Sequence, residues 1–242
     1  MSQDHRNAFG QPIGPPLTEW IERALPPRSP MIGRFCRVEP IDPAVHTEAL
    51  YEAFGEAPND SNWTYLPYGP FATFDDFSTW LATFCIHEDP LFFAIVNSKT
   101  TKPVGIASYL RIQPQVGVIE VGHIHYAPQL QRTTAATEAM FMMMSRAFDE
   151  LGYRRYEWKC DALNQPSRDA AGRLGFTFEG IFRQATIYKG RSRDTAWFSV
   201  TDQEWPELKQ AYQRWLSPEN HDQRGKQRQT LTELRQLGSH QQ

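Results

Sequence analysis

The stretch APQLQRTTAATEAM, residues 127–140, decides the fold. The β-rich run before it predicts a strand that ends at Tyr126, and the small residues within it predict a helix from about Thr134. The first backbone N–H groups of a helix have no intrahelical acceptor, and the helix dipole favours an anion beside them. This strand–loop–helix unit therefore predicts a cradle for a pyrophosphate, although it contains no glycine. An ordinary capped helix is the alternative interpretation.

Strand-like runs lie on both sides of this unit. We expect strands at residues 31–41, 91–97, 104–112, 118–126 and 153–160. The short connectors between residues 91 and 126 indicate an antiparallel meander. A final hairpin is predicted from two runs, 176–188 and 194–200, around the turn KGRSRD at 189–194.

Helices are predicted from caps and from apolar residues at helical spacing. We expect them at residues 43–54, 73–84 and 134–151, between Pro166 and Gly175, and after the capping box Thr201-x-x-Glu204. Strands and helices together indicate the α+β (mixed α/β) class in a single domain. The proline-rich residues 1–30 predict an extended N-terminal arm, 31–206 the domain itself, and 207–242 a C-terminal helical extension and tail.

The bulk composition excludes several classes of partner. A net charge of −3 and a pI near 6.2 leave no basic excess for nucleic acid. The cysteines Cys36, Cys85 and Cys160 form no C-x-x-C pair, so neither a disulfide framework nor a metal site is expected. The N-terminus lacks a signal-peptide core, and no stretch reaches the roughly 20 apolar residues of a membrane span. We therefore expect a cytoplasmic protein without nucleic-acid, membrane or metal partners.

The order of these elements resembles the GNAT (GCN5-related) N-acetyltransferase superfamily, as do the motifs RVEPIDPAVHTEALYEAF, IEVGHIHYAP and LGFTFEGIFRQA. The resemblance is closest to the ribosomal-protein N-terminal acetyltransferase branch and covers residues 31–206. It implies a central, mostly antiparallel twisted sheet with helices on both faces. It also implies transfer of acetyl from acetyl-CoA directly to a primary amine, either a protein N-terminus or a small molecule, by a monomer or homodimer.

The family's pyrophosphate loop, Gln/Arg-x-x-Gly-x-Gly/Ala, falls on residues 131–136. The cofactor-binding residues implied there are Gln131, Arg132, Thr133, Thr134, Ala135 and Ala136, with Thr134 in place of the usual glycine. The preceding strand is implied to contribute Ile124 and His125, and Asn164 to hydrogen-bond the pantetheine arm. Taken as residues alone, an Asn and a Ser are also ordinary at the start of a helix.

Acetyl transfer needs a base for the amine and a proton for the leaving thiolate. Ala171 stands where many members carry a tyrosine that protonates the thiolate, so the resemblance assigns this role to Ser167. Thr186 replaces a glutamate that serves some relatives as the base. Glu120 is therefore the predicted base, acting directly or through a water.

Strand alternation places Glu120, Gly122 and Ile124 on one face and His123 and His125 on the other. His123 has a suitable unperturbed pKa for a base, so a histidine stays open as an alternative.

The aromatic loop between the first two helices is implied to line the acceptor pocket with Trp63, Tyr65 and Tyr68, with core packing as the competing account. A second function class is an acyl-CoA-binding module of the same fold without efficient turnover. Thr134, Ala171 and Thr186, which depart from the family pattern, favour that alternative.

Overall fold

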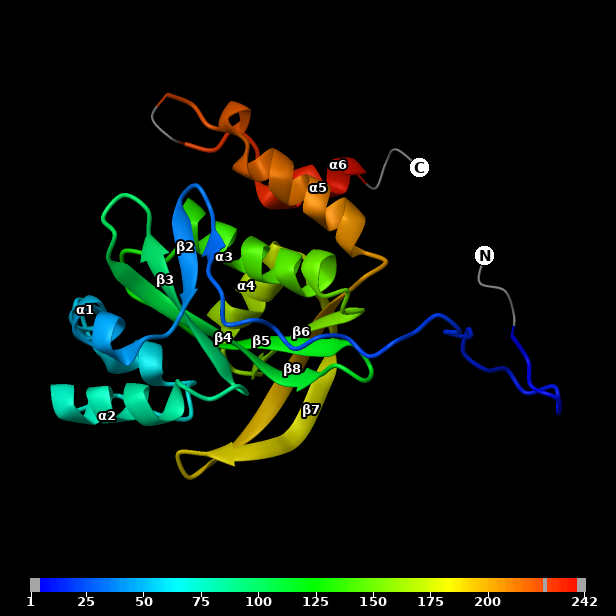
Figure 1. The fold of residues 1–242 in the computed structure, drawn as a ribbon, viewed down its shortest axis with the longest axis horizontal. Helices are drawn as coiled ribbons and strands as arrows, with labels where there is room; N and C mark the ends of the chain where they lie inside the picture. Colours follow the sequence, from blue (N-terminus) through cyan, green and yellow to red (C-terminus); the bar gives the residue numbers. More distant parts are fainter. Residues whose placement is uncertain (1–4, 224–225, 239–242) are drawn as a thin grey trace.

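A computed structural model describes residues 5–223 and 226–238, and within them eight strands form one sheet. The strands are β1 (Met31–Ile32), β2 (Cys36–Pro40), β3 (Leu91–Asn97), β4 (Pro103–Gln113), β5 (Val118–Tyr126), β6 (Arg155–Asp161), β7 (Thr177–Tyr188) and β8 (Arg191–Thr201). Their order in the sheet is β1-β2-β3-β4-β5-β6-β8-β7 (Figure 1). Among these strands, only the neighbours β5 and β6 run parallel, so the predicted mostly antiparallel sheet is confirmed.

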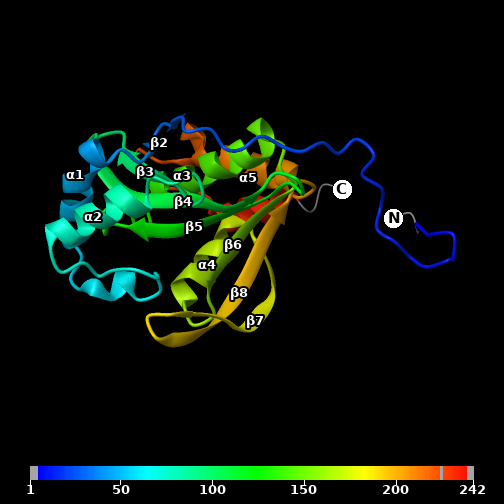
Figure 2. The same cartoon turned by 60° about the horizontal axis from the view of Figure 1, so that its bottom comes forward.

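Helices cover both faces of the sheet, as predicted (Figures 1 and 2). On one face, α1 (Pro43–Gly55) and α2 (Phe74–Phe84) enclose an aromatic core with β3 and β4. On the other face lie α3 (Thr134–Ser145), α4 (Gln165–Leu174), α5 (Trp205–Leu216) and α6 (Leu231–Gly238), whose buried side chains share the larger core. Short turns of helix occur at η1 (Asp60–Trp63), η2 (Arg146–Glu150) and η3 (Pro218–Asn220).

Helices α1 and α2 begin within one residue of the predicted positions, because side chains satisfy their first N–H groups. The Asp42 carboxylate accepts from the N–H of Ala44 at 2.9 Å, and the Thr73 hydroxyl accepts from the N–H of Asp76 at 3.1 Å. The helix predicted to run to residue 151 instead changes at Ser145 into the π-helical turn η2.

The strand predicted at 31–41 is interrupted between Ile32 and Cys36. The buried carboxylate of Glu138 on α3 accepts hydrogen bonds from the N–H groups of Arg34, Phe35 and Cys36, at 2.9, 2.6 and 2.9 Å. These amides therefore bind a side chain from 102–104 residues away and leave the strand ladder. A β-carbon on Gly33 would lie 2.5 Å from Glu138 Oε2, so only glycine fits this close approach.

The turn of the final hairpin is shorter than predicted. Lys189 and Gly190 both have positive φ, +48° and +70°, and β8 already begins at Arg191. Positive φ at both central residues is the mark of the two-residue turn that best fits the twist of a hairpin. The rest of the predicted turn, residues 191–194, therefore belongs to the strand.

The N-terminal arm lies along the domain only in its second half. Trp20 donates its indole N–H to the carbonyl of Gln115 at 2.8 Å, and the buried Arg146 donates to the carbonyls of Ser29 and Pro30. Before Trp20 the described chain runs away from the body (Figures 1 and 2). No helix in the described ranges has the length and apolar character to cross a bilayer.

Candidate active site

The sheet opens into a fork between β5 and β6. The two strands pair in parallel from Val118 opposite Arg155 to Val121 opposite Trp158. Beyond that point β5 stays paired with β4 as far as Tyr126, whereas β6 stays paired with β8 as far as Asp161. The facing edges of β5 and β6 therefore separate after Val121, and their backbone groups face each other across a gap in the ladder.

A β-bulge lies on the β5 side of this fork. His123 has a φ of +51°, and the β4–β5 register shifts between Ile106 and Ser108. The bulge inserts one residue into the alternation, so the predicted division of faces is wrong. The His123 and His125 rings both pack on the face of α1 and α2, the face that also carries Glu120, whereas Ile124 packs against the larger core.

The helix α3 begins beside the end of β5, so its first turn lies where the sequence predicts a cradle. Thr133 caps the helix by accepting from the N–H of Ala136 at 3.2 Å. The positive φ, +59°, falls on the exposed Arg132, whereas Thr134 is the first residue of the helix itself. A helical backbone does not require glycine, which explains how a threonine is accommodated at this position. Gln131 stabilises the loop by donating its amide to the carbonyl of Tyr126 at 3.0 Å.

Thr134→Glu is expected to weaken acetyl-CoA binding about 10- to 100-fold. A carboxylate in the first turn suits the helix dipole, so the fold itself tolerates the change. Against a pyrophosphate about 5 Å away, the same charge costs about 1–3 kcal/mol. Calorimetric titration with acetyl-CoA measures the effect, and Ala44→Glu in the first turn of α1 is the matched control. Equal affinities for both variants would place the cofactor elsewhere.

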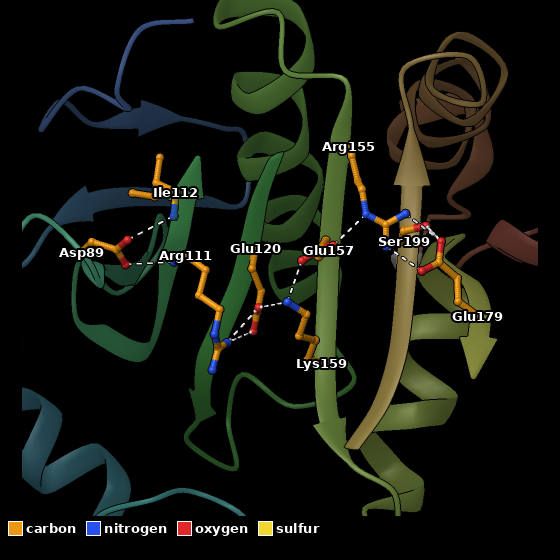
Figure 3. Close-up of polar contacts among 9 residues, drawn as sticks. All are labelled: Asp89, Arg111, Ile112, Glu120, Arg155, Glu157, Lys159, Glu179 and Ser199. Carbon is orange, nitrogen blue, oxygen red and sulfur yellow. Dashed lines mark hydrogen bonds and ion pairs between the residues drawn. The ribbon is translucent and has the colours of Figure 1, made fainter. Parts of the chain in front are cut away.

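Glu120 lies just before the fork on β5, with its side chain only 3% exposed. Its two oxygens are 2.7 and 2.8 Å from Nη1 of Arg111, and one oxygen is 3.0 Å from Nζ of Lys159 (Figure 3). Burial raises the pKa of Glu120, and the charges of Lys159 and Arg111 oppose that rise. The result is a carboxylate that is more basic than usual and that two cations keep in place.

The two histidines of β5 are held as neutral rings, with His125 buried and His123 half-buried. His123 Nδ1 lies 3.0 Å from the hydroxyl of Tyr68, and burial lowers the pKa of His123 to about 4. The ring of His125 stacks on Trp63, with 3.8 Å between the ring centroids, and contacts Phe54. Burial lowers the pKa of His125 to about 3. These environments make either imidazole a weaker base than the carboxylate of Glu120.

Ser167 and Asn164 lie at the start of α4, just beyond the end of β6. The Ser167 hydroxyl accepts from the indole N–H of Trp158 at 3.0 Å, so its own proton is not used in that bond. Asn164 caps α4, because its side-chain oxygen accepts from the N–H of Ser167 at 3.2 Å. Ala171, further along α4, is fully buried.

Three segments meet at the mouth of the fork. The Tyr65 hydroxyl donates to the carbonyl of Leu163 at 3.2 Å, which links the aromatic loop to the turn after β6. The β7–β8 hairpin reaches the same place, because Lys189 donates to the carbonyl of Trp63 at 2.7 Å. Tyr188 of this hairpin also donates to the Asp161 carboxylate at 2.8 Å. Trp63 itself is buried, so it forms the floor of this region more than its rim.

The structure therefore brings together, around the fork, the residues expected to bind the cofactor and those expected at the acceptor mouth. Sequence reasoning missed Arg111 and Lys159, the two cations on Glu120. The available signal was the spacing of Glu157 and Lys159, which are two residues apart and therefore lie on the same face of their strand. Glu157 is paired with Glu120 in the sheet, so all three side chains share that face. Within the described ranges, no group of three or more His, Cys, Asp or Glu side chains is arranged to bind a metal ion.

Comparison with known proteins agrees with this geometry. The sequence profile of the acetyltransferase (GNAT) domain family matches residues 37–177. The crystal structure of a GCN5-related N-acetyltransferase from Brucella melitensis is 49% identical; the match covers 91% of this chain and 100% of that one, with a TM-score of 0.89. An uncharacterized N-acetyltransferase, p20, of Bacillus licheniformis is 27% identical over 117 residues, which are 47% of this chain and 63% of that relative. The chain thus matches less than two thirds of the length of this relative.

A more distant structure has its ligands bound. The microcin C7 self immunity acetyltransferase MccE, in complex with acetyl-CoA and AMP, is 22% identical and has a TM-score of 0.62. The match covers 73% of this chain and 98% of that one, and at this identity it shows a shared fold alone. The family profile spans more than half of the chain, from β2 into β7. The chain therefore belongs to the GNAT acetyltransferase family.

Proposed function

We propose that this protein transfers an acetyl group from acetyl-CoA directly to a primary amine, with residues 31–206 as the transferase domain. The observation that carries the proposal is the position of Glu120, a buried carboxylate one residue before β5 and β6 part. The parting edges offer backbone donors and acceptors to a pantetheine arm. The first turn of α3 offers free N–H groups to the pyrophosphate. Membership of the GNAT family and the acetyl-CoA bound to MccE support this assignment of the cofactor.

The residues divide the reaction between the two sides of the fork. The amine nitrogen forms its bond to the thioester carbon while Glu120, directly or through a water, takes the proton that the amine loses. The bond from that carbon to sulfur then breaks. Ser167, on the β6 side, gives its proton to the leaving thiolate and regains one from water. Burial favours Glu120 as the base because it raises the pKa of this carboxyl.

The acceptor side supports an α-amine over a lysine-like amine. An N-terminal α-amine has a pKa of about 7.7–8.0 and is partly deprotonated at neutral pH, whereas the lysine amine, at about 10.4, is not. Some relatives use a glutamate as the base at the position that Thr186 occupies here, exposed on β7. Glu120 is therefore the glutamate that remains to take the proton. We therefore place the acceptor among protein N-termini or small amines of similar pKa, as in the ribosomal-protein N-terminal acetyltransferase branch.

A panel of amines tests the proposal. Thiol release from acetyl-CoA is followed with amino-acid amides, short peptides and lysine-like alkylamines, and mass spectrometry identifies the acetylated product. Calorimetry with acetyl-CoA is run in parallel. We expect turnover with α-amines in preference to lysine-like amines at pH 7. Tight cofactor binding without turnover of any amine would instead support an acyl-CoA-binding module, the role that Ala171 and Thr134 favour.

A further inference from the structure

The carboxylate of Glu120 has two cationic partners of unequal kind. Lys159 is 9% exposed, and its ammonium also contacts the Glu157 carboxylate at 2.7 Å and the Trp197 ring at 3.8 Å. Arg111 is 58% exposed and reaches Glu120 through Nη1. Lys159 is therefore buried against the sheet, whereas the Arg111 side chain is largely exposed; Figure 3 shows the two cations on opposite sides of the Glu120 carboxylate.

The backbone directs Arg111 to this position. Its φ is +47°, and the β4–β5 register shifts between Leu110 and Gln113. The Asp89 carboxylate stabilises this bulge by accepting from the N–H groups of Arg111 and Ile112, at 2.9 and 3.0 Å. A non-glycine residue in this region of φ is uncommon and needs such support. The fork thus uses a supported irregularity of β4 to bring a long, exposed cation over Glu120.

The contact that Arg111 makes is one that a primary ammonium can also make. One nitrogen, Nη1, lies within 2.8 Å of both carboxylate oxygens. This is the geometry of a single positively charged nitrogen on a carboxylate, not that of the parallel fork in which arginine uses two nitrogens. An acceptor ammonium in the same place would keep the charge of Glu120 compensated and would put its nitrogen where the carboxylate can take a proton.

We propose that the Arg111 guanidinium occupies the position of the acceptor's ammonium, and that the acceptor enters by displacing it. Arg111 then acts as a gate, because it competes with the acceptor for the carboxylate of Glu120. Lys159 remains in place when the acceptor binds. This inference rests on the proposed function, because it concerns the same carboxylate. It admits amines that bind as ammonium ions and are slim enough to reach Glu120 beside Lys159, and among these an α-amine, with its lower pKa, gives its proton to Glu120 more readily than a lysine-like amine does.

The test replaces Arg111 with glutamine, which removes the competing charge but keeps a polar side chain on the surface. The KM for the acceptor is expected to fall about threefold to tenfold, since the competing state is removed. The KM for acetyl-CoA is expected to stay unchanged. Arg37→Gln is the matched control, because Arg37 is 37% exposed and pairs with Glu39 on β2, outside the fork. This control is expected to leave both KM values as they are.

A second measurement does not depend on turnover. Butylammonium chloride is titrated into each protein in the presence of CoA, and binding is followed by calorimetry. Tighter binding to Arg111→Gln than to the parent supports the gate even if no acceptor in the panel is acetylated. Failure of the proposed function is thereby distinguishable from failure of the gate. An acceptor KM that rises or stays the same in Arg111→Gln, with butylammonium binding no tighter, overturns the inference.

Discussion

Glu120→Gln is expected to lower kcat at pH 7 by about 10²- to 10⁴-fold, the range in which a general base contributes. Glutamine has nearly the same shape, so the β5–β6 pairing before the fork is retained. It removes the carboxylate that we propose receives the proton of the amine. The buried Lys159 loses one of its two carboxylate partners but keeps Glu157 at 2.7 Å. Acetyl-CoA affinity is therefore expected to change little, which calorimetry checks.

The pH dependence of the rate is expected to shift in a definite direction in Glu120→Gln. The proposed mechanism needs Glu120 ionised, so the rate of the parent protein is expected to rise as pH passes through the pKa of this carboxyl, which burial raises above its ordinary value. In Glu120→Gln only the free amine reacts, so the rising limb moves upward toward the pKa of the acceptor, about 7.7–8.0 for an α-amine. Turnover is measured against pH with one α-amine and one lysine-like amine. Superimposable profiles for the two proteins would remove Glu120 from the mechanism.

Glu138→Ala is expected to lower the free energy of unfolding by on the order of 3–5 kcal/mol. The variant leaves three N–H groups, those of Arg34, Phe35 and Cys36, without their acceptor in a largely buried site. Each unsatisfied buried amide costs about 1–3 kcal/mol, and entering water offsets part of the sum. The substitution is also expected to disturb the first turn of α3 in the candidate active site, because the thiol of Cys36 donates to the carbonyl of Ala135 there.

Urea unfolding followed by fluorescence measures this loss. Glu48→Ala is the matched control, since Glu48 is exposed on α1, and a surface substitution of this kind usually stays within about 0.5 kcal/mol. Glu138→Gln keeps one acceptor oxygen and is expected to fall between the two. A loss below about 1 kcal/mol in Glu138→Ala would mean that the β1–β2 turn does not depend on this carboxylate.

Much of the architecture could be predicted because its signals are local. The cap at Asp42, the meander of β3 to β5 and the start of α3 at Thr134 each depend on residues within a few positions of one another. The prediction of a pyrophosphate cradle depends on the same kind of local signal. Local propensity and local periodicity agree there with the final fold.

The features that could not be predicted depend on partners distant in sequence. The break in the first predicted strand needs Glu138, more than 100 residues away, and the bulge that places His123 on the face of Glu120 appears only in the pairing of β4 with β5. The contact of Arg111 with Glu120 needs a second bulge, supported by Asp89. A period-two pattern cannot reveal an inserted residue, so the faces of β5 were divided wrongly beyond Gly122.

The central claim is that acetyl-CoA binds in the fork between β5 and β6, and amide hydrogen exchange tests it most directly. Exchange is measured residue by residue with and without saturating acetyl-CoA. We expect added protection on both edges of the fork, at residues 122–126 and 159–161, and in the first turn of α3 at Thr134 and Ala135. Binding of acetyl-CoA that leaves exchange at these three places unchanged would contradict it.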